Sequence, residues 1–188
     1  MPYASLRTTA HSNLITSTCR TSIAAVTVLT TLLRPTDGLA EQPTIVPMPQ
    51  EYQADAGHLR LVQGKAVGFA IHVGRDATDK ELLGADWIAR ETESLTGLRS
   101  TIVRYQTGSR ENDGRVLLGV HAGGRPIDKF IAAQLDRKHI DILSDPSKTE
   151  QAYVLVVNDN AVLIMGRSEQ GALYGAMTLL QLLERDGN

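Results

Sequence analysis

Cysteine, aromatic residues and net charge are all scarce in this chain of 188 residues. The single cysteine, Cys19, excludes an intramolecular disulfide. Aromatic residues make up 4% of the chain, which argues against a sugar-stacking platform or a base-stacking sheet. The net charge of −2 is too small to indicate nucleic acid as a partner. What remains, with 42% hydrophobic residues, is the composition of an ordinary globular domain.

The first forty residues are typical of a leader. Arg7 and Arg20 supply positive charge, and the apolar stretch 21–33 has the length of a signal-peptide core and is short for a membrane span. Small residues precede a cleavage site after Ala40. We therefore expect 1–40 to be a signal peptide, and the mature protein to be exported to the periplasm, the cell envelope or the medium, with no membrane contact after cleavage. The alternatives are a disordered leader and an anchor that is never cleaved.

From residue 41 to residue 188 the chain has no Ser- or Gly-rich linker, no repeat and no low-complexity block, so we expect one domain there. The order of strands and helices predicts an α/β fold of the α+β type, with helices packed on a mixed, largely antiparallel sheet. Strands are predicted over 58–62, 66–73, 100–105, 115–120, 153–157 and 161–165, and helices over 78–97, 126–135 and 168–183.

Local signals support these helices. Thr78 and Glu81 form a capping-box pattern, Gly97 closes the first helix, and Pro126 is typical of a helix start. Ser168 is placed to cap the last helix. The stripe expected to lie on the core in that helix consists of Ala172, Leu173, Ala176, Leu179, Leu180 and Leu183.

The two strands before the last helix form a predicted hairpin. The segment 153–157 and the segment 161–165 are both apolar throughout, and Asn158, Asp159 and Asn160 between them are turn formers. A strand that is apolar on both faces is normally covered on both faces. We therefore expect the hairpin to be central in the sheet.

Residues with catalytic chemistry are few and scattered. The histidines after residue 40 show no metal-ligand spacing. The segment Gly119–Arg125 joins a strand to a helix, but it matches neither a dinucleotide fingerprint nor a P-loop, and a turn is the better interpretation. Asp76, Asp79 and Glu81 are explained by helix capping and dipole complementarity. We therefore predict no catalytic residue, no cofactor-binding residue and no metal site.

A family resemblance rests on the two ends of the domain. The run from Glu150 to Leu183 resembles the end of the N-terminal accessory domain of β-N-acetylhexosaminidases of glycoside hydrolase families 20 and 84. Its core is Tyr153 and Leu155, then a strand ending in glycine, then Gly171-Ala-Leu-Tyr-Gly175 and Thr178-Leu-Leu-Gln-Leu-Leu183. The opening Ile45-Val-Pro-Met-Pro-Gln50 is also similar. The motif does not separate the two families from each other or from α-glucuronidases, which carry a related domain.

This resemblance implies a catalytic barrel as the partner, with glycans reached only through that barrel. In these families the barrel follows the accessory domain and uses an Asp-Glu or Asp-Asp pair, and this sequence contains neither dipeptide. The expectation is therefore an accessory domain that is inactive alone, from a truncated or split product of an amino-sugar glycosidase. The alternative is a free-standing carbohydrate- or protein-binding module.

A second face of the last helix does not belong to the stripe that is expected to lie on the core. Tyr174, Met177, Thr178 and Gln181 form a semi-polar surface, and contacts between domains are more polar than cores. We predict that these four residues touch the barrel. A half-exposed helix face with no partner is the competing interpretation.

Overall fold

The computed structural model describes residues 3–5, 59, 61–63, 66–67, 69–106, 114–158 and 160–186. The predicted leader lies outside the described residues except for the short strand β1 (Tyr3–Ser5), which pairs antiparallel with β9 (Glu184–Asp186). The resemblance at residues 45–50 also lies outside them. Strands β2 (Val62–Gln63) and β3 (Ala66–Val67) form a short antiparallel ribbon.

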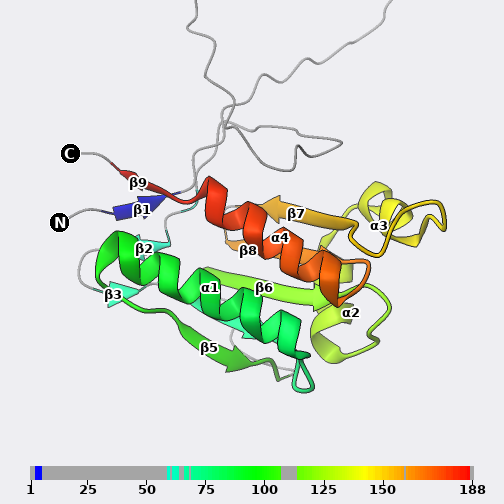
Figure 1. Cartoon of the computed structure of the whole chain (residues 1–188), viewed down its shortest axis with the longest axis horizontal. Helices are drawn as coiled ribbons and strands as arrows, with labels where there is room; N and C mark the ends of the chain where they lie inside the picture. The colour runs from blue at the N-terminus through cyan, green and yellow to red at the C-terminus, as the bar shows by residue number, and fades with distance from the viewer. Residues whose placement is uncertain are drawn as a thin grey trace, which may run out of the picture.

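A five-stranded sheet in the order β5-β4-β6-β8-β7 forms the centre of the domain (Figure 1). As described, the pairs β5–β4, β4–β6 and β6–β8 are parallel, and β7–β8 is antiparallel. The bounds of the strands are β4 Phe69–Val73, β5 Thr101–Arg104, β6 Gly114–Val120, β7 Tyr153–Val157 and β8 Ala161–Gly166.

The prediction of a mixed sheet is confirmed, and the prediction that it is largely antiparallel is wrong. The chain crosses over the sheet through a helix between β4 and β5, and such a crossover returns the next strand in the same direction. Only a tight turn reverses direction between neighbouring strands, and the sheet as described has one such turn, between β7 and β8.

In the described part of the chain, four helices cover the two faces of this sheet (Figure 1). Helices α1 (Asp79–Thr96) and α4 (Glu169–Leu182) lie side by side on one face. Helices α2 (Pro126–Gln134) and α3 (Arg137–Ser144) lie on the other. The sequence predicted α2 but not α3. None of the helices in the described ranges is both long enough and apolar enough to cross a lipid bilayer.

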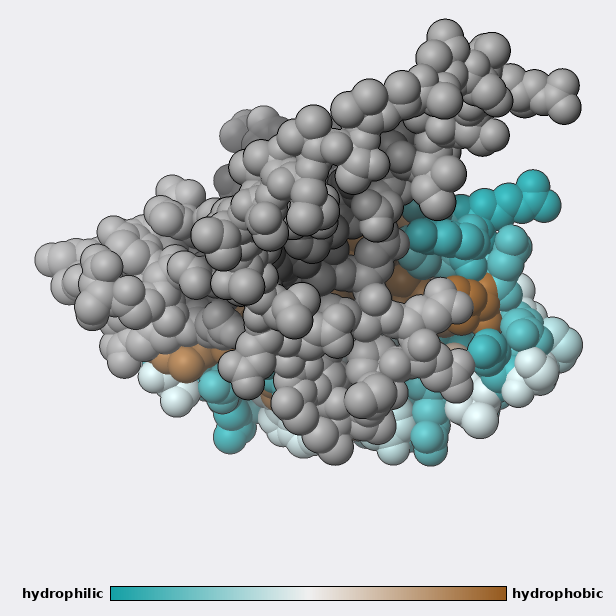
Figure 2. Space-filling model, turned by 90° about the horizontal axis from the view of Figure 1, so that it is seen from above, coloured by the Kyte–Doolittle hydropathy of each residue, from teal (hydrophilic) through white to brown (hydrophobic). Residues whose placement is uncertain are grey.

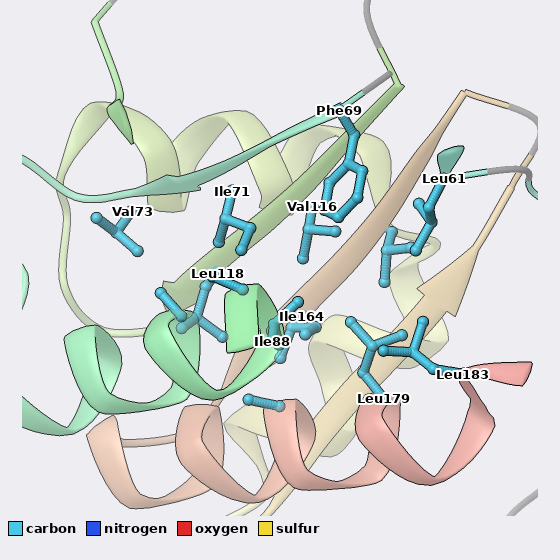
Figure 3. Packing of buried hydrophobic residues seen from close by; sticks show 14 of the residues in the cluster. Leu61, Phe69, Ile71, Val73, Ile88, Val116, Leu118, Ile164, Leu179 and Leu183 are labelled. Atoms are coloured by element: carbon cyan, nitrogen blue, oxygen red, sulfur yellow. The ribbon is translucent and has the colours of Figure 1, made fainter. Parts of the chain in front are cut away.

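Alternation along the strands separates two hydrophobic clusters. In β6, Val116 and Leu118 face α1 and α4, whereas Leu117 between them packs with α2 and α3. Figure 3 shows the first cluster, in which Ile71 and Ile164 of the sheet lie near helix residues such as Ile88. Strands β6 and β8 therefore bury apolar side chains on both faces, as is usual for interior strands of a parallel sheet.

The predicted helix signals are confirmed. The Oγ1 of Thr78 accepts the N–H of Glu81, and the Glu81 carboxylate accepts the N–H of Thr78, so the capping box is complete. Gly97 ends α1 in the left-handed region with φ of 77°. Ser168 caps α4 by accepting the N–H of Gln170. All residues of the predicted α4 stripe are buried except Leu180, which is partly buried.

The hairpin forms as predicted, but only one of its strands is interior. The Oδ1 of Asn158 accepts the N–H groups of Asn160 and Ala161 and thereby builds the turn. Strand β8 is buried along its whole length. Strand β7 lies at the edge of the sheet as described, so the prediction of a central hairpin is wrong for β7. Its apolar side chains are covered in part by α4 and α3.

Candidate functional site

Within the described ranges, no cluster of three or more His, Cys, Asp or Glu residues is arranged to hold a metal ion. An open pocket of about 430 Å³ is lined by Tyr105, Pro126, Lys129 and Phe130. Its lining contains no carboxylate, whereas glycoside hydrolysis normally needs a pair of them. This pocket therefore lacks the carboxylate pair that glycoside hydrolysis normally uses.

A serine and a histidine do approach each other at the ends of β6 and α3. The Nε2 of His121 lies 2.9 Å from the Oγ of Ser144. The Ser144 hydroxyl donates its single proton to the carbonyl of Ile140 at 2.8 Å, so His121 donates to it rather than acting as its base. The Nδ1 of His121 is buried without a hydrogen-bond partner in the described structure. The distance is within the range of a nucleophile and general base, but among the described residues no third group orients the imidazole through its Nδ1.

The place where this class of sheet usually holds a ligand lies between β4 and β6. After β4 the chain enters α1 on one face, and after β6 it enters α2 on the other. In open α/β sheets, ligands bind outside the carboxyl ends of strands at such a reversal. We name this place, between Gly74 after β4, Val120 at the end of β6 and the first turns of α1 and α2, the switch-point crevice.

The switch-point crevice is filled by the chain itself. The Nη1 and Nη2 of Arg125 donate to the two carboxylate oxygens of Glu81 at 2.9 and 2.7 Å. The Nε and Nη2 of Arg125 donate to the Oδ2 and Oδ1 of Asp128 at 2.8 and 2.9 Å. The Glu81 side chain is 0% exposed, that of Asp128 1% and that of Arg125 15%. One guanidinium thus satisfies two buried carboxylates through two forked pairs.

The electrostatics of this cluster follow from its burial and from the two helix ends. The hydrogen bonds that Arg125 donates to Glu81 first, and to Asp128 second, raise the pKa of Arg125 above its ordinary value, against the effect of burial. The carboxylates lie in the first turns of α1 and α2, where helix dipoles favour negative charge. The sequence explained Glu81 by capping and dipole complementarity and placed Arg125 in a turn, and it did not indicate their pairing because the two residues are 44 positions apart.

The motif that carries the family resemblance is a packing device. A Cβ on Gly171 would lie 2.2 Å from the carbonyl oxygen of Ala152, and one on Gly175 would lie 2.5 Å from the Cγ2 of Ile164. A Cβ on Gly166 would lie 2.0 Å from the backbone nitrogen of Ala172. These glycines let α4 lie directly against the β7–β8 hairpin.

Polar atoms of the same motif also bond within the domain. The Tyr153 hydroxyl lies 2.6 Å from the Oγ1 of Thr178, which joins β7 to α4. Thr178 is 5% exposed, so this member of the predicted inter-domain face is turned towards the sheet. Tyr174 and Met177 are partly buried and Gln181 is exposed, so these three lie on the outer side of α4. Whether they touch another domain stays a prediction.

Helix α1 adds apolar residues on the same side of the sheet. The two helices meet closely, because a Cβ on Gly84 would lie 3.0 Å from the Cβ of Ala176. On α1, Leu83 is 41% exposed and Trp87 is partly buried. Figure 2 views the molecule from above and not onto the outer sides of α1 and α4, and in it described hydrophobic residues lie next to hydrophilic ones. We name Leu83, Trp87, Tyr174, Met177 and Gln181 the two-helix face.

Comparison with known proteins gives a family and a fold. Residues 42–188 match the family described as Glycosyl hydrolase family 20, domain 2. No curated protein matches. Among solved structures, the one titled "Structure of CpGH84D" is 18% identical with a TM-score of 0.54. The match covers 76% of this chain and 21% of that chain, so this chain spans about a fifth of the length of the solved relative.

The family match covers most of the chain, and it includes the motif between Glu150 and Leu183. The structural match is to a family 84 enzyme, and at this identity it shows the fold alone. The resemblance drawn from the sequence is thereby confirmed, and the chain belongs to the family of glycosyl hydrolase family 20, domain 2, the N-terminal accessory domain of hexosaminidases of this type.

Proposed function

We propose that this chain is a non-catalytic accessory domain that packs its two-helix face against the catalytic barrel of a β-N-acetylhexosaminidase acting on amino-sugar glycosides. The observation that carries the proposal is that the residues of the family motif pack α4 against the β7–β8 hairpin. Gly166, Gly171, Gly175 and Tyr153 all serve to seat α4 on the hairpin. A motif committed to internal packing supports a scaffolding role for this part of the domain.

The two-helix face has the character of a contact between domains. It combines the half-exposed apolar side chains of Leu83, Trp87 and Met177 with the polar groups of Tyr174 and Gln181. Contacts between domains within one chain are typically more polar than obligate interfaces, and their buried parts are enriched in aromatic residues and methionine. The outer sides of α1 and α4 therefore offer the barrel a mixed surface on a rigid, closely packed helix pair.

A binding measurement tests this proposal. The full chain is titrated by calorimetry with a separately produced catalytic barrel of a family 20 β-N-acetylhexosaminidase, and we expect binding. Met177→Lys should weaken it by about tenfold or more, because burying an unpaired ammonium costs at least about 1.4 kcal/mol. The matched control is Ala133→Lys, an exposed position of α2 on the opposite side of the sheet, which should leave binding unchanged.

Two outcomes would contradict the proposal. If Met177→Lys and Ala133→Lys weakened binding to the barrel equally, the two-helix face would not be the contact surface. Turnover of an aryl N-acetylglucosaminide by the purified chain alone would show that the domain has an active site of its own.

A further inference from the structure

The side chain of Arg125 occupies the switch-point crevice as a ligand would. Its guanidinium forms forked pairs with Glu81 and with Asp128, at distances of 2.7 to 2.9 Å. The carboxylates approach different edges of the guanidinium plane, since Glu81 takes the two terminal nitrogens and Asp128 takes Nε and Nη2. This matches the planar, forked geometry that distinguishes a guanidinium from an ammonium.

Both carboxylates are also held by groups other than this guanidinium. Glu81 accepts the backbone N–H of Thr78 at 3.0 Å as part of the capping box. Asp128 accepts the backbone N–H of Val120 at 2.9 Å and that of Arg125 at 3.0 Å. These backbone bonds do not depend on the Arg125 side chain, so they remain available to hold the two carboxylates in an Arg125→Ala variant.

Glycines leave room for the flat cation and for the carboxylate beside it. A Cβ on Gly74 would lie 2.8 Å from the Nη1 of Arg125, so glycine at this position leaves room for the guanidinium against the backbone after β4. A Cβ on Gly123 would lie 2.2 Å from the Oδ2 of Asp128. The space therefore fits a planar group of this size at this place.

We propose that the switch-point crevice is a preformed guanidinium-binding pocket that the chain fills with its own Arg125. In the intact protein this occupant closes the crevice to outside ligands and ties the start of α1 to the start of α2. Without the side chain, two buried carboxylates face an empty space of guanidinium shape, and the pocket takes up a free guanidinium ion. This inference concerns a site separate from the two-helix face.

Chemical rescue of Arg125→Ala in the full chain tests the pocket. We expect the variant to have a lower midpoint of thermal unfolding than the native chain. Low-millimolar guanidinium chloride should raise that midpoint in a saturable way, whereas sodium chloride and tetramethylammonium chloride at equal concentration should not. Guanidinium ordinarily weakens folded states, so a rise has the opposite sign from the general effect.

A double variant and the native chain supply the controls. Glu81→Gln combined with Arg125→Ala removes one carboxylate and should lose the guanidinium-dependent rise, and the native chain should show none. The absence of a rise in Arg125→Ala, or an equal rise in the double variant, overturns the proposal.

A measurement on the native chain decides the matter if Arg125→Ala does not fold. Nitrogen-15 NMR of the arginine side chains should show separate, slowly exchanging Nη protons for Arg125, because every nitrogen of its guanidinium is held. Arg90, whose side chain is 68% exposed and bonds Asp86 at the surface, is the internal comparison and should show averaged signals. Averaged signals for Arg125 as well would overturn the proposal.

Discussion

The hydroxyl of Tyr153 and the hydroxyl of Thr178 lie 2.6 Å apart, and this bond joins the edge strand β7 to the last helix α4. Strand β7 has a neighbour on one side only in the described sheet, so a side-chain bond to the helix adds a second attachment. The same bond turns Thr178 away from the surface and leaves Tyr174, Met177 and Gln181 as the outer members of the predicted face.

Tyr153→Phe removes the hydroxyl and keeps the ring. We expect a loss of about 0.5–1.5 kcal/mol in the free energy of unfolding, the usual net value of one partly buried hydrogen bond. Urea denaturation measures it. In the double variant that combines Tyr153→Phe with Thr178→Val, the two losses of unfolding free energy should be strongly non-additive, because both substitutions remove the same bond. Simple additivity would mean that the two hydroxyls do not stabilise the fold together.

Gly171→Ala should lower the stability of the domain, although a Gly→Ala substitution within a helix normally raises it. In a helix interior, alanine is favoured over glycine by about 1 kcal/mol. Here the added Cβ meets the carbonyl oxygen of Ala152, and a backbone shift costs about 1–3 kcal/mol. The chemical-denaturation midpoint should therefore fall. Gln181→Ala, at an exposed position of the same helix, is the control and should change stability little. A stabilised Gly171→Ala would contradict the close packing of α4.

Thr78→Ala should remove the side-chain acceptor at the start of α1. The expected loss is about 1 kcal/mol in the free energy of unfolding, typical of a lost N-cap. Thermal unfolding followed by circular dichroism checks it, with Thr101→Ala in the exposed edge strand β5 as the comparison. An equal loss at both positions would argue against a specific capping role.

The pKa of Glu169 depends on Lys80 across the two helix starts. The Lys80 ammonium, 2.8 Å from the carboxylate, lowers the pKa of Glu169 below its usual range, and Thr78 adds to the effect. A lowered pKa in the folded state contributes stability above the unfolded value and loses it as the pH falls through the folded value. Lys80→Ala should raise the pKa, as followed by carbon-13 NMR titration. An unchanged titration would show that the ion pair does not form in solution.

Much of the architecture could be predicted because its signals are local. The capping box at Thr78 and Glu81, the Asn158 turn and the apolar stripe of α4 are each encoded within a few neighbouring residues. Strand direction was predicted less well. Hairpin signals are visible in sequence, whereas the parallel pairing of β6 with β8 depends on where a distant crossover returns the chain.

The parts that could not be predicted depend on partners far apart in the sequence. Helix α3 was missed because it is short and its first residues carry no side-chain cap. Glu81 has a sufficient local explanation as a capping residue, so nothing in the sequence indicated its pairing with Arg125. Likewise, the position of Thr178 along the helix predicts a surface residue. Only the structure shows that the Thr178 hydroxyl faces the sheet and bonds to Tyr153 of β7.

The place of β8 within the sheet also bears on synthesis at the ribosome. This strand is the penultimate long element of the chain, yet it sits between β6 and β7 and contributes to both hydrophobic clusters. Among the described strands, the β4–β6 layer has no neighbour on that side until β8 has emerged. A nascent chain that stalls earlier would hold an open strand edge, and folding is therefore expected to wait for the carboxyl-terminal quarter to be translated.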